Sequence, residues 1–211
     1  MEIKKEYYSK VAETVIKNLK NRNMDAYYCD NKEEAVKKML EIMEEGKSVT
    51  WGGTMTMAEL GIVSELEKRN FVLLDRAKAK NREEVEKIYR DAFNADYYLM
   101  SSNAVTMQGE LINIDGNGNR VAALIYGPKQ VIIVVGMNKI VKDVESGEQR
   151  IKSIAAPMNT MRLNCDTPCA KTGVCHDCLG KNTICCTTVV TRYARHTDRI
   201  KVILVGEELG Y

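Results

Sequence analysis

The sequence predicts an α/β fold in which helices flank a central, parallel-rich sheet. Short apolar runs alternate with segments whose apolar residues recur every three to four positions, as strands and helices do. The run Gln130–Val135 is almost wholly apolar, which is typical of a strand buried on both faces of a parallel sheet. Alternating strands and helices are joined by right-handed crossovers, so we expect one main sheet.

In the first half of the chain, the pattern predicts helices at Ile3–Leu19, Lys32–Glu45 and Arg82–Phe93, and strands at Ala26–Cys29, Ser48–Trp51, Phe71–Leu74 and Asp96–Met100. Gly46 is expected to close the second helix as its C-cap. Thr56 with Glu59 three residues later fits a capping box, so a further helix is expected from Thr56 to about Arg69.

In the second half, the strand Leu111–Ile114 enters a glycine- and asparagine-rich turn at Asp115–Asn119. This turn is interpreted as a hairpin, so Arg120–Tyr126 is expected to return as a strand. Further strands are predicted at Gln130–Val135, Thr187–Val190 and Ile200–Val205, and helices near Lys139–Val144 and at Glu148–Arg162, the latter broken or bent at Pro157.

Size and charge limit the class of protein. The 211 residues suit one domain, 1–211, with a cysteine-rich loop insert at 164–186. The 31 basic and 29 acidic residues nearly balance, so we expect no nucleic acid partner. The apolar runs are too short to cross a bilayer and Met1–Lys20 lacks a signal-peptide core, so a cytoplasmic protein without a membrane span is expected.

Two segments indicate a site for a small anion. The glycine turn after Ser48–Trp51 supplies Gly52, Gly53, Thr54 and Thr56, where free backbone N–H groups at a helix start would favour negative charge. Polar residues crowd the next unit, and its candidates are Asn103, Thr106, Gln108 and Arg120. The planar guanidinium of Arg120 suits a carboxylate or phosphate. The alternatives are a tight turn without a ligand and a solvated hairpin.

Six of the seven cysteines lie in Asn164–Cys186 with the spacing C-x3-C-x5-C-x2-C-x6-CC. The expected metal ligands are Cys165, Cys169, Cys175 and Cys178, with Cys185 or Cys186 as a substitute for one of them. Four thiolates suit Zn²⁺ and a [4Fe-4S] cluster equally well. Redox-active thiols and incidental buried cysteines are the alternatives. Cys29 stands alone and is expected to be a small buried residue.

Several of these motifs together resemble the LUD-domain (lactate utilization) family. They are Trp51–Thr56 with Glu59–Gly61, Asp96–Asn103, Gly109–Arg120, Pro128–Asn138 and Arg199–Gly210, which span nearly the whole chain. The resemblance implies a fold similar to that of sugar-phosphate isomerases and CoA-transferases, with a ligand site at the carboxyl ends of the central strands. The Gly52–Thr56 turn and the Ser101–Gln108 segment would face that site. The cysteine-bearing insert looks like a version found in proteins of anaerobic bacteria.

The resemblance also implies a role in the oxidation of lactate or another 2-hydroxy acid, with a small anionic substrate and iron–sulfur partner proteins. The cysteine site would then hold a cluster that passes electrons. CoA-transferases of the related fold use a glutamate nucleophile, which Gln108 cannot be. The second hypothesis is a non-catalytic ligand-binding or regulatory subunit with structural zinc. The sequence identifies no catalytic residue and leaves open whether the chain is an enzyme or forms a homo-oligomer.

Overall fold

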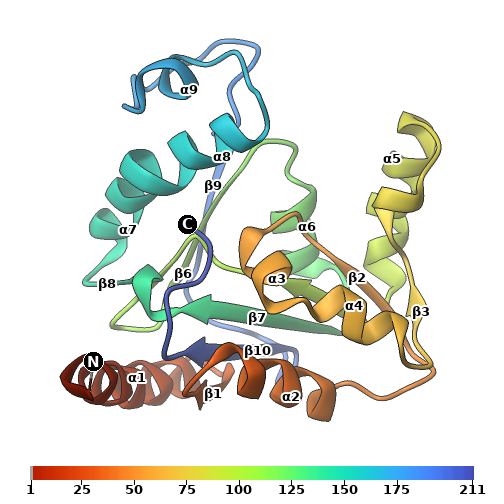
Figure 1. Ribbon diagram of the computed structural model, residues 1–211, viewed down its shortest axis with the longest axis vertical. Coiled ribbons are helices and arrows are strands. Elements are labelled where there is room, and N and C mark those ends of the chain that lie inside the picture. Colours follow the sequence, from red (N-terminus) through yellow and green to blue (C-terminus); the bar gives the residue numbers. More distant parts are fainter. Residues whose placement is uncertain (1) are drawn as a thin grey trace.

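The structure, a computed structural model, describes residues 2–211 and is built around a wholly parallel six-stranded sheet (Figure 1). In spatial order its strands are β1 (Asp25–Cys29), β10 (Ile200–Val205), β7 (Gln130–Gly136), β4 (Tyr97–Met100), β2 (Ser48–Trp51) and β3 (Val72–Leu73). The apolar run of β7 lies centrally and is buried apart from Gln130. The predicted α/β class with a parallel-rich sheet is therefore confirmed.

Helices cover both faces of this sheet because successive residues of a strand point to opposite sides. Val131 and Ile133 of β7 pack in one cluster with α1 (Glu2–Asn21) and α6 (Asn119–Tyr126). Ile132 and Val134 pack on the other side with α2 (Lys32–Ile42), α3 (Met55–Leu60) and α4 (Ile62–Glu67). The helix α5 (Arg82–Asp91) stands at the β3 edge with no fully buried residue. Within residues 2–211, no helix is long and apolar enough to cross a membrane.

A second, mixed sheet lies beside the first. In order, its strands are β8 (Ile140–Val141), β5 (Ala104–Thr106), β6 (Leu111–Asp115) and β9 (Thr187–Thr191). Over it runs one helical stretch made of α7 (Val144–Arg150), a π-helical turn (Ile151–Ala155) and α8 (Ala156–Arg162). The helical stretch continues through Pro157, where a break or bend was expected, with the π turn ending two residues before it, and the helix begins earlier than Glu148. The helix α9 (Pro168–Thr172) begins the cysteine segment.

The expected hairpin at Asp115–Asn119 is wrong. Gly118 adopts a left-handed conformation (φ 79°) and caps α6, while the Asp115 carboxylate accepts the Gly118 N–H at 2.8 Å. Arg120–Tyr126 is therefore helical and not a returning strand. The hairpin lies one turn earlier, between β5 and β6, where Gly109 has φ 86°.

Three helix boundaries also differ from the prediction. The helix expected from Thr56 to Arg69 begins after Thr54 and is divided at Gly61, which has φ 64°. The helix expected at Lys32–Glu45 ends at Ile42, and Met43 caps it in place of Gly46. The helix expected at Lys139–Val144 is a 3-10 turn (Met137–Lys139) followed by β8.

Candidate functional site

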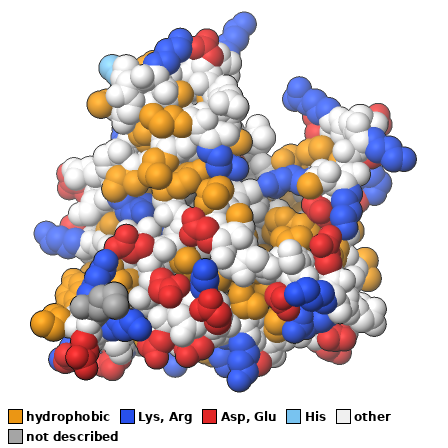
Figure 2. All heavy atoms as spheres, in the orientation of Figure 1, with side chains coloured by type: hydrophobic (Ala, Val, Ile, Leu, Met, Phe, Trp, Pro, Cys, Tyr) orange, Lys and Arg blue, Asp and Glu red, His pale blue; other side chains and the backbone are white. Residues whose placement is uncertain are grey.

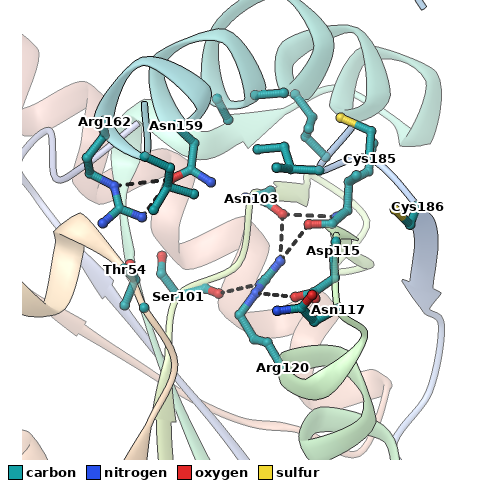
Figure 3. A pocket seen from close by; sticks show the side chains of 18 of the residues that line it. Thr54, Ser101, Asn103, Asp115, Asn117, Arg120, Asn159, Arg162, Cys185 and Cys186 are labelled. Atoms are coloured by element: carbon teal, nitrogen blue, oxygen red, sulfur yellow. Dashed lines mark hydrogen bonds and ion pairs between the residues drawn. The ribbon is translucent and has the colours of Figure 1, made fainter. Parts of the chain in front are cut away.

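A pocket of about 550 Å³ lies where three strands of the parallel sheet end (Figure 3). Gly53 follows β2, Ser101 follows β4 and Lys139 follows β7, and all three line it. Residues from α5, α8 and the cysteine segment close the other sides. Figure 2 shows a hollow between the part of the molecule that carries α8 and α9 and the part that carries α5. Ligands of α/β proteins commonly bind at this end of the strands.

Four of the eight ligand-binding candidates line the pocket, namely Gly53, Thr54, Asn103 and Arg120. Gly52 lies behind it, where a Cβ would approach the Tyr98 hydroxyl to 3.1 Å. Thr56 is fully buried next to Lys139 and is not the capping residue that its spacing indicated.

Thr106 and Gln108 lie outside the pocket. Thr106 Oγ1 accepts the backbone N–H of Glu110 at 3.0 Å. The Gln108 carbonyl accepts a hydrogen bond from Arg22 Nε, at 2.6 Å, near the end of α1. The structure therefore divides the segment Ser101–Gln108, whose first three residues line the pocket while its end faces α1.

Arg120 is bonded entirely within the protein. A guanidinium has five N–H groups, and Arg120 makes five hydrogen bonds of 2.6–3.3 Å. The acceptors are the carboxylate of Asp115, the side-chain oxygens of Asn103 and Asn113, and the carbonyls of Ser101 and Ile114. Figure 3 shows Asp115, Asn103 and Ser101 around Arg120. The residue lies beside the pocket, as predicted, but its donors hold β4, β6 and α6 together.

Four other cations line the pocket, and sequence reasoning missed all of them: Arg76, Lys139, Arg162 and Lys181. None forms an ion pair with a carboxylate of residues 2–211. Among the lining residues of that range, Asp115 is the one with a side-chain carboxylate, and it pairs with Arg120. The pocket is therefore positively charged.

Lys139 is the most deeply buried of these cations. Its side chain is 2% exposed, and Nζ lies 2.9 Å from Thr56 Oγ1 and 3.1 Å from Ser101 Oγ. Burial, reinforced by the nearby charges of Arg150 and Arg120, lowers the pKa of Lys139 to about 7. Its position just after the central apolar strand is the signal by which the sequence could have identified it.

Arg76 explains why position 53, in the turn after β2, is a glycine. A Cβ on Gly53 would lie 2.4 Å from Arg76 Nη2, so the glycine leaves room for that guanidinium. The Arg76 guanidinium also lies 5.9 Å from the ring centre of Tyr89. Opposite it, Arg162 donates to Asn159 Oδ1 at 2.7 and 3.1 Å (Figure 3). The Tyr211 hydroxyl, also at the pocket, is buried next to Arg162.

The cysteine segment forms one wall of the pocket through Lys181, Thr183, Ile184, Cys185 and Cys186. The Cys186 N–H donates to the Asp115 carbonyl at 3.1 Å, and Ile184 lies against Gly116. Two regions that the sequence treated as separate candidates are therefore adjacent.

The thiols differ in environment. Cys169 is buried, yet hydrogen bonds from Thr160, Thr167 and nearby backbone N–H groups outweigh that burial and lower its pKa. The Cys185 residue is exposed as a whole, but partial burial of its thiol, and then the charges of the Cys175, Cys169 and Cys178 thiolates, raise the pKa of Cys185 to about 11. Thiolates are suitable ligands for soft metals, so the donor chemistry fits zinc or an iron–sulfur cluster.

The positions of the thiols do not yet form a metal site. Within residues 2–211, no three Cys, His, Asp or Glu side chains are grouped tightly enough to hold an ion. Cys169 lies against α8 through Thr160, Cys185 and Cys186 line the pocket, and Cys169, Cys175 and Cys178 are near enough to Cys185 for their charges to act on it. The predicted metal ligands therefore stay a prediction.

Comparison with known proteins identifies the family. A search of curated proteins gives no match. The chain is similar to the crystal structure of a DUF162 family protein from Deinococcus radiodurans, with 14% identity and a TM-score of 0.56 over 94% of this chain and 98% of that one. Two more distant structures match about half of the chain. One is a ribose-5-phosphate isomerase in complex with phospho-erythronic acid, with 18% identity and a TM-score of 0.36 over 54% of each chain. The other is eIF2B delta from Chaetomium thermophilum, with 13% identity and a TM-score of 0.37 over 54% of this chain and 49% of that one. Because the LUD domain model matches residues 12–205, the chain belongs to the LUD domain family.

Proposed function

We propose that the chain is a cytoplasmic lactate-utilization-type protein that takes part in the oxidation of lactate or another 2-hydroxy acid, and that its pocket binds the anionic substrate. The family supports the metabolic role. The observation that carries the binding proposal is the set of four cations without carboxylate partners around one cavity. A bound carboxylate or phosphate would supply the missing negative charge.

Different pocket residues could bind different groups of the substrate. Arg76 and Arg162 have planar guanidinium groups, which bind carboxylate and phosphate oxygens in pairs. The hydroxyls of Thr54, Ser101 and Tyr211 could bond the polar groups of a 2-hydroxy acid. A volume of about 550 Å³ is larger than lactate needs, so a bulkier 2-hydroxy acid is also accommodated.

In the same proposal, Cys165, Cys169, Cys175 and Cys178, with Cys185 or Cys186 replacing one of them, hold zinc or a [4Fe-4S] cluster. A cluster bound there would supply one-electron transfer. The contact between the segment and the pocket wall supports this role because it would keep the cluster near the substrate.

A non-catalytic subunit with structural zinc is the second candidate, and the exposure of the insert favours it. Leu179 is 97% exposed and Val174 is also exposed, so the segment has little hydrophobic core of its own. A structural zinc ion contributes stability in that situation.

Anaerobic purification followed by a visible spectrum and iron and zinc analysis distinguishes the two candidates. Brown absorption with about four irons per chain would support electron transfer, and one zinc without colour would support the structural role. Free thiols without either metal would contradict both metal proposals.

Thermal melting with lactate, phosphate and coenzyme A tests the pocket separately, because a ligand that binds the folded protein raises the melting temperature. Arg76→Gln and Arg162→Gln should reduce the shift. Arg195→Gln removes an exposed arginine outside the pocket and should leave it unchanged. Equal shifts in all three variants would contradict the proposed site.

A further inference from the structure

Building on the proposed function, we propose that Lys139 contacts the bound anion and that its protonation is coupled to binding. The amine takes up a proton as a small carboxylate or phosphate enters the pocket. This assigns a role to a lysine at the end of the central strand, and it makes binding of the anion dependent on pH.

The geometry holds the amine without neutralising it. Thr56 and Ser101 are buried, and their hydroxyl oxygens lie within 3.1 Å of Lys139 Nζ. A hydroxyl can accept a hydrogen bond from an ammonium group or donate one to a neutral amine. The two hydroxyls therefore suit both protonation states, and neither supplies the negative charge that an ion pair would.

The charges around Lys139 come from three elements. Arg150 of α7 and Arg120 of α6 both disfavour its ammonium form, and Glu59 of α3 favours it. Glu59 is exposed and accepts the Gly210 N–H at 2.8 Å, and it forms no ion pair with Lys139. Arg150 is held by the backbone, because it donates to the carbonyls of Asn138 and Asn103. The net effect of burial and these charges is a pKa of about 7.

An anion in the pocket changes this balance. A negative charge beside Nζ favours the ammonium form, so the pKa of Lys139 rises and a proton is bound together with the ligand. Below about pH 7 the lysine is already charged and little proton uptake is expected. Above pH 7, uptake should approach one proton, and the affinity should fall by about tenfold per pH unit.

Isothermal titration calorimetry of the full chain tests this inference. Lactate and inorganic phosphate are titrated separately, between pH 6 and 8.5, each in two buffers with different ionisation enthalpies. Lactate keeps a constant charge over this range, so its proton uptake reports on the protein. Uptake with lactate alone identifies a carboxylate site, and uptake with phosphate alone, beyond that due to its own ionisation, identifies a phosphate site.

Matched variants separate Lys139 from the rest of the pocket. Lys139→Met should lose the proton uptake and bind the anion at least tenfold more weakly at pH 6.5. Lys139→Arg keeps a permanent charge and should bind without uptake. Lys5→Met, which removes an exposed lysine outside the pocket, should retain both the binding and the uptake. Wild-type binding without proton uptake, or uptake that persists in Lys139→Met, would overturn this inference but leave the pocket proposal standing. Failure of both anions to bind wild type would overturn the pocket proposal together with it.

Discussion

Two buried cations near the pocket differ in what surrounds them. Arg120 has an acceptor for each of its five N–H groups, including the carboxylate of Asp115. Lys139 has two hydroxyls and no carboxylate. The first arrangement stabilises the fold, whereas the second costs stability and is retained where a charge serves binding.

Replacing Lys139 by Met should therefore stabilise the protein. The folded-state pKa of about 7 lies below the usual 10.5, so the folded form binds its proton less readily than the unfolded form. The gain should be constant below about pH 7 and fall by about 1.4 kcal/mol per pH unit between pH 7 and 10.5. Urea unfolding at pH 6, 8 and 9.5 measures it. A loss of stability at pH 6 would show that the two hydroxyl contacts outweigh the burial of charge.

Replacing Arg120 by Met should have the opposite effect. The substitution leaves Asp115, Asn103 and Asn113 without their donor in a buried position, and such losses cost about 3–5 kcal/mol. Arg162→Met removes an exposed arginine bonded to one side chain and should cost less than about 1 kcal/mol. Urea unfolding of both variants is the measurement. Equal costs would contradict the structural role of Arg120.

For Arg120, the sequence predicted the position beside the pocket but not the internal hydrogen bonds. Arg120 was selected because its side chain can bind an anion, and the residue does lie beside the pocket. Its partners come from β4, β6 and the loops after them, and only the folded chain brings those acceptors together.

Among the elements, the β5–β6 hairpin depends on a glycine for two separate reasons. Gly109 has φ 86°, which L residues rarely adopt. A Cβ there would also lie 2.9 Å from the backbone of Asn18 and Leu19, so α1 packs directly on the turn. Gly46 has a similar φ of 84° but no neighbour within 4 Å.

Comparing substitutions at Gly46 and Gly109 therefore separates the cost of the backbone conformation from the cost of a clash with α1. Gly46→Ala should cost about 1–2 kcal/mol, from the backbone conformation alone. Gly109→Ala should cost a further 1–3 kcal/mol or more, because backbone atoms of α1 must move. Urea unfolding of the two variants gives the difference directly. Equal costs would mean that α1 does not approach the hairpin as closely as the structure shows.

Elements with a long, regular pattern were predicted well, and short apolar segments after a turn were not. The apolar residues of Arg120–Tyr126 fit a strand or a helix, and the glycine-rich turn before them was interpreted as a hairpin. The structure selects the helix because Asp115 bonds the Gly118 N–H, which sets the left-handed cap. The same local ambiguity explains why a helix was expected at Lys139–Val144.

For the whole molecule, the sequence could locate the pocket only in part. Gly53 and Asn103 were recognised from turns that follow strands. Arg76, Lys139 and Arg162 come from separate regions of the chain, and nothing local marks them as neighbours. The contact between the cysteine segment and the pocket likewise arises only on folding, through the Cys186 N–H and the Asp115 carbonyl.

That contact leads to a prediction about the molecule as a whole. Binding of metal by the cysteine segment should order the pocket wall formed by residues 181–186, so an anion would no longer bear that ordering cost. The anion should then bind about fivefold or more tightly to the metal-loaded protein, and the anion should increase metal affinity by the same factor.

Calorimetry of lactate and phosphate with metal-loaded and chelator-treated protein measures the first factor, and a competing chelator with and without the anion measures the second. Cys175→Ser and Cys178→Ser should abolish the effect, whereas Cys29→Ala should retain it, because Cys29 is buried in β1 away from the segment. Equal anion affinities at full metal occupancy would show that the wall is already ordered without metal. The cysteine segment and the pocket would then be neighbours without energetic coupling, and the case for a shared function would rest on the chemistry of the metal alone.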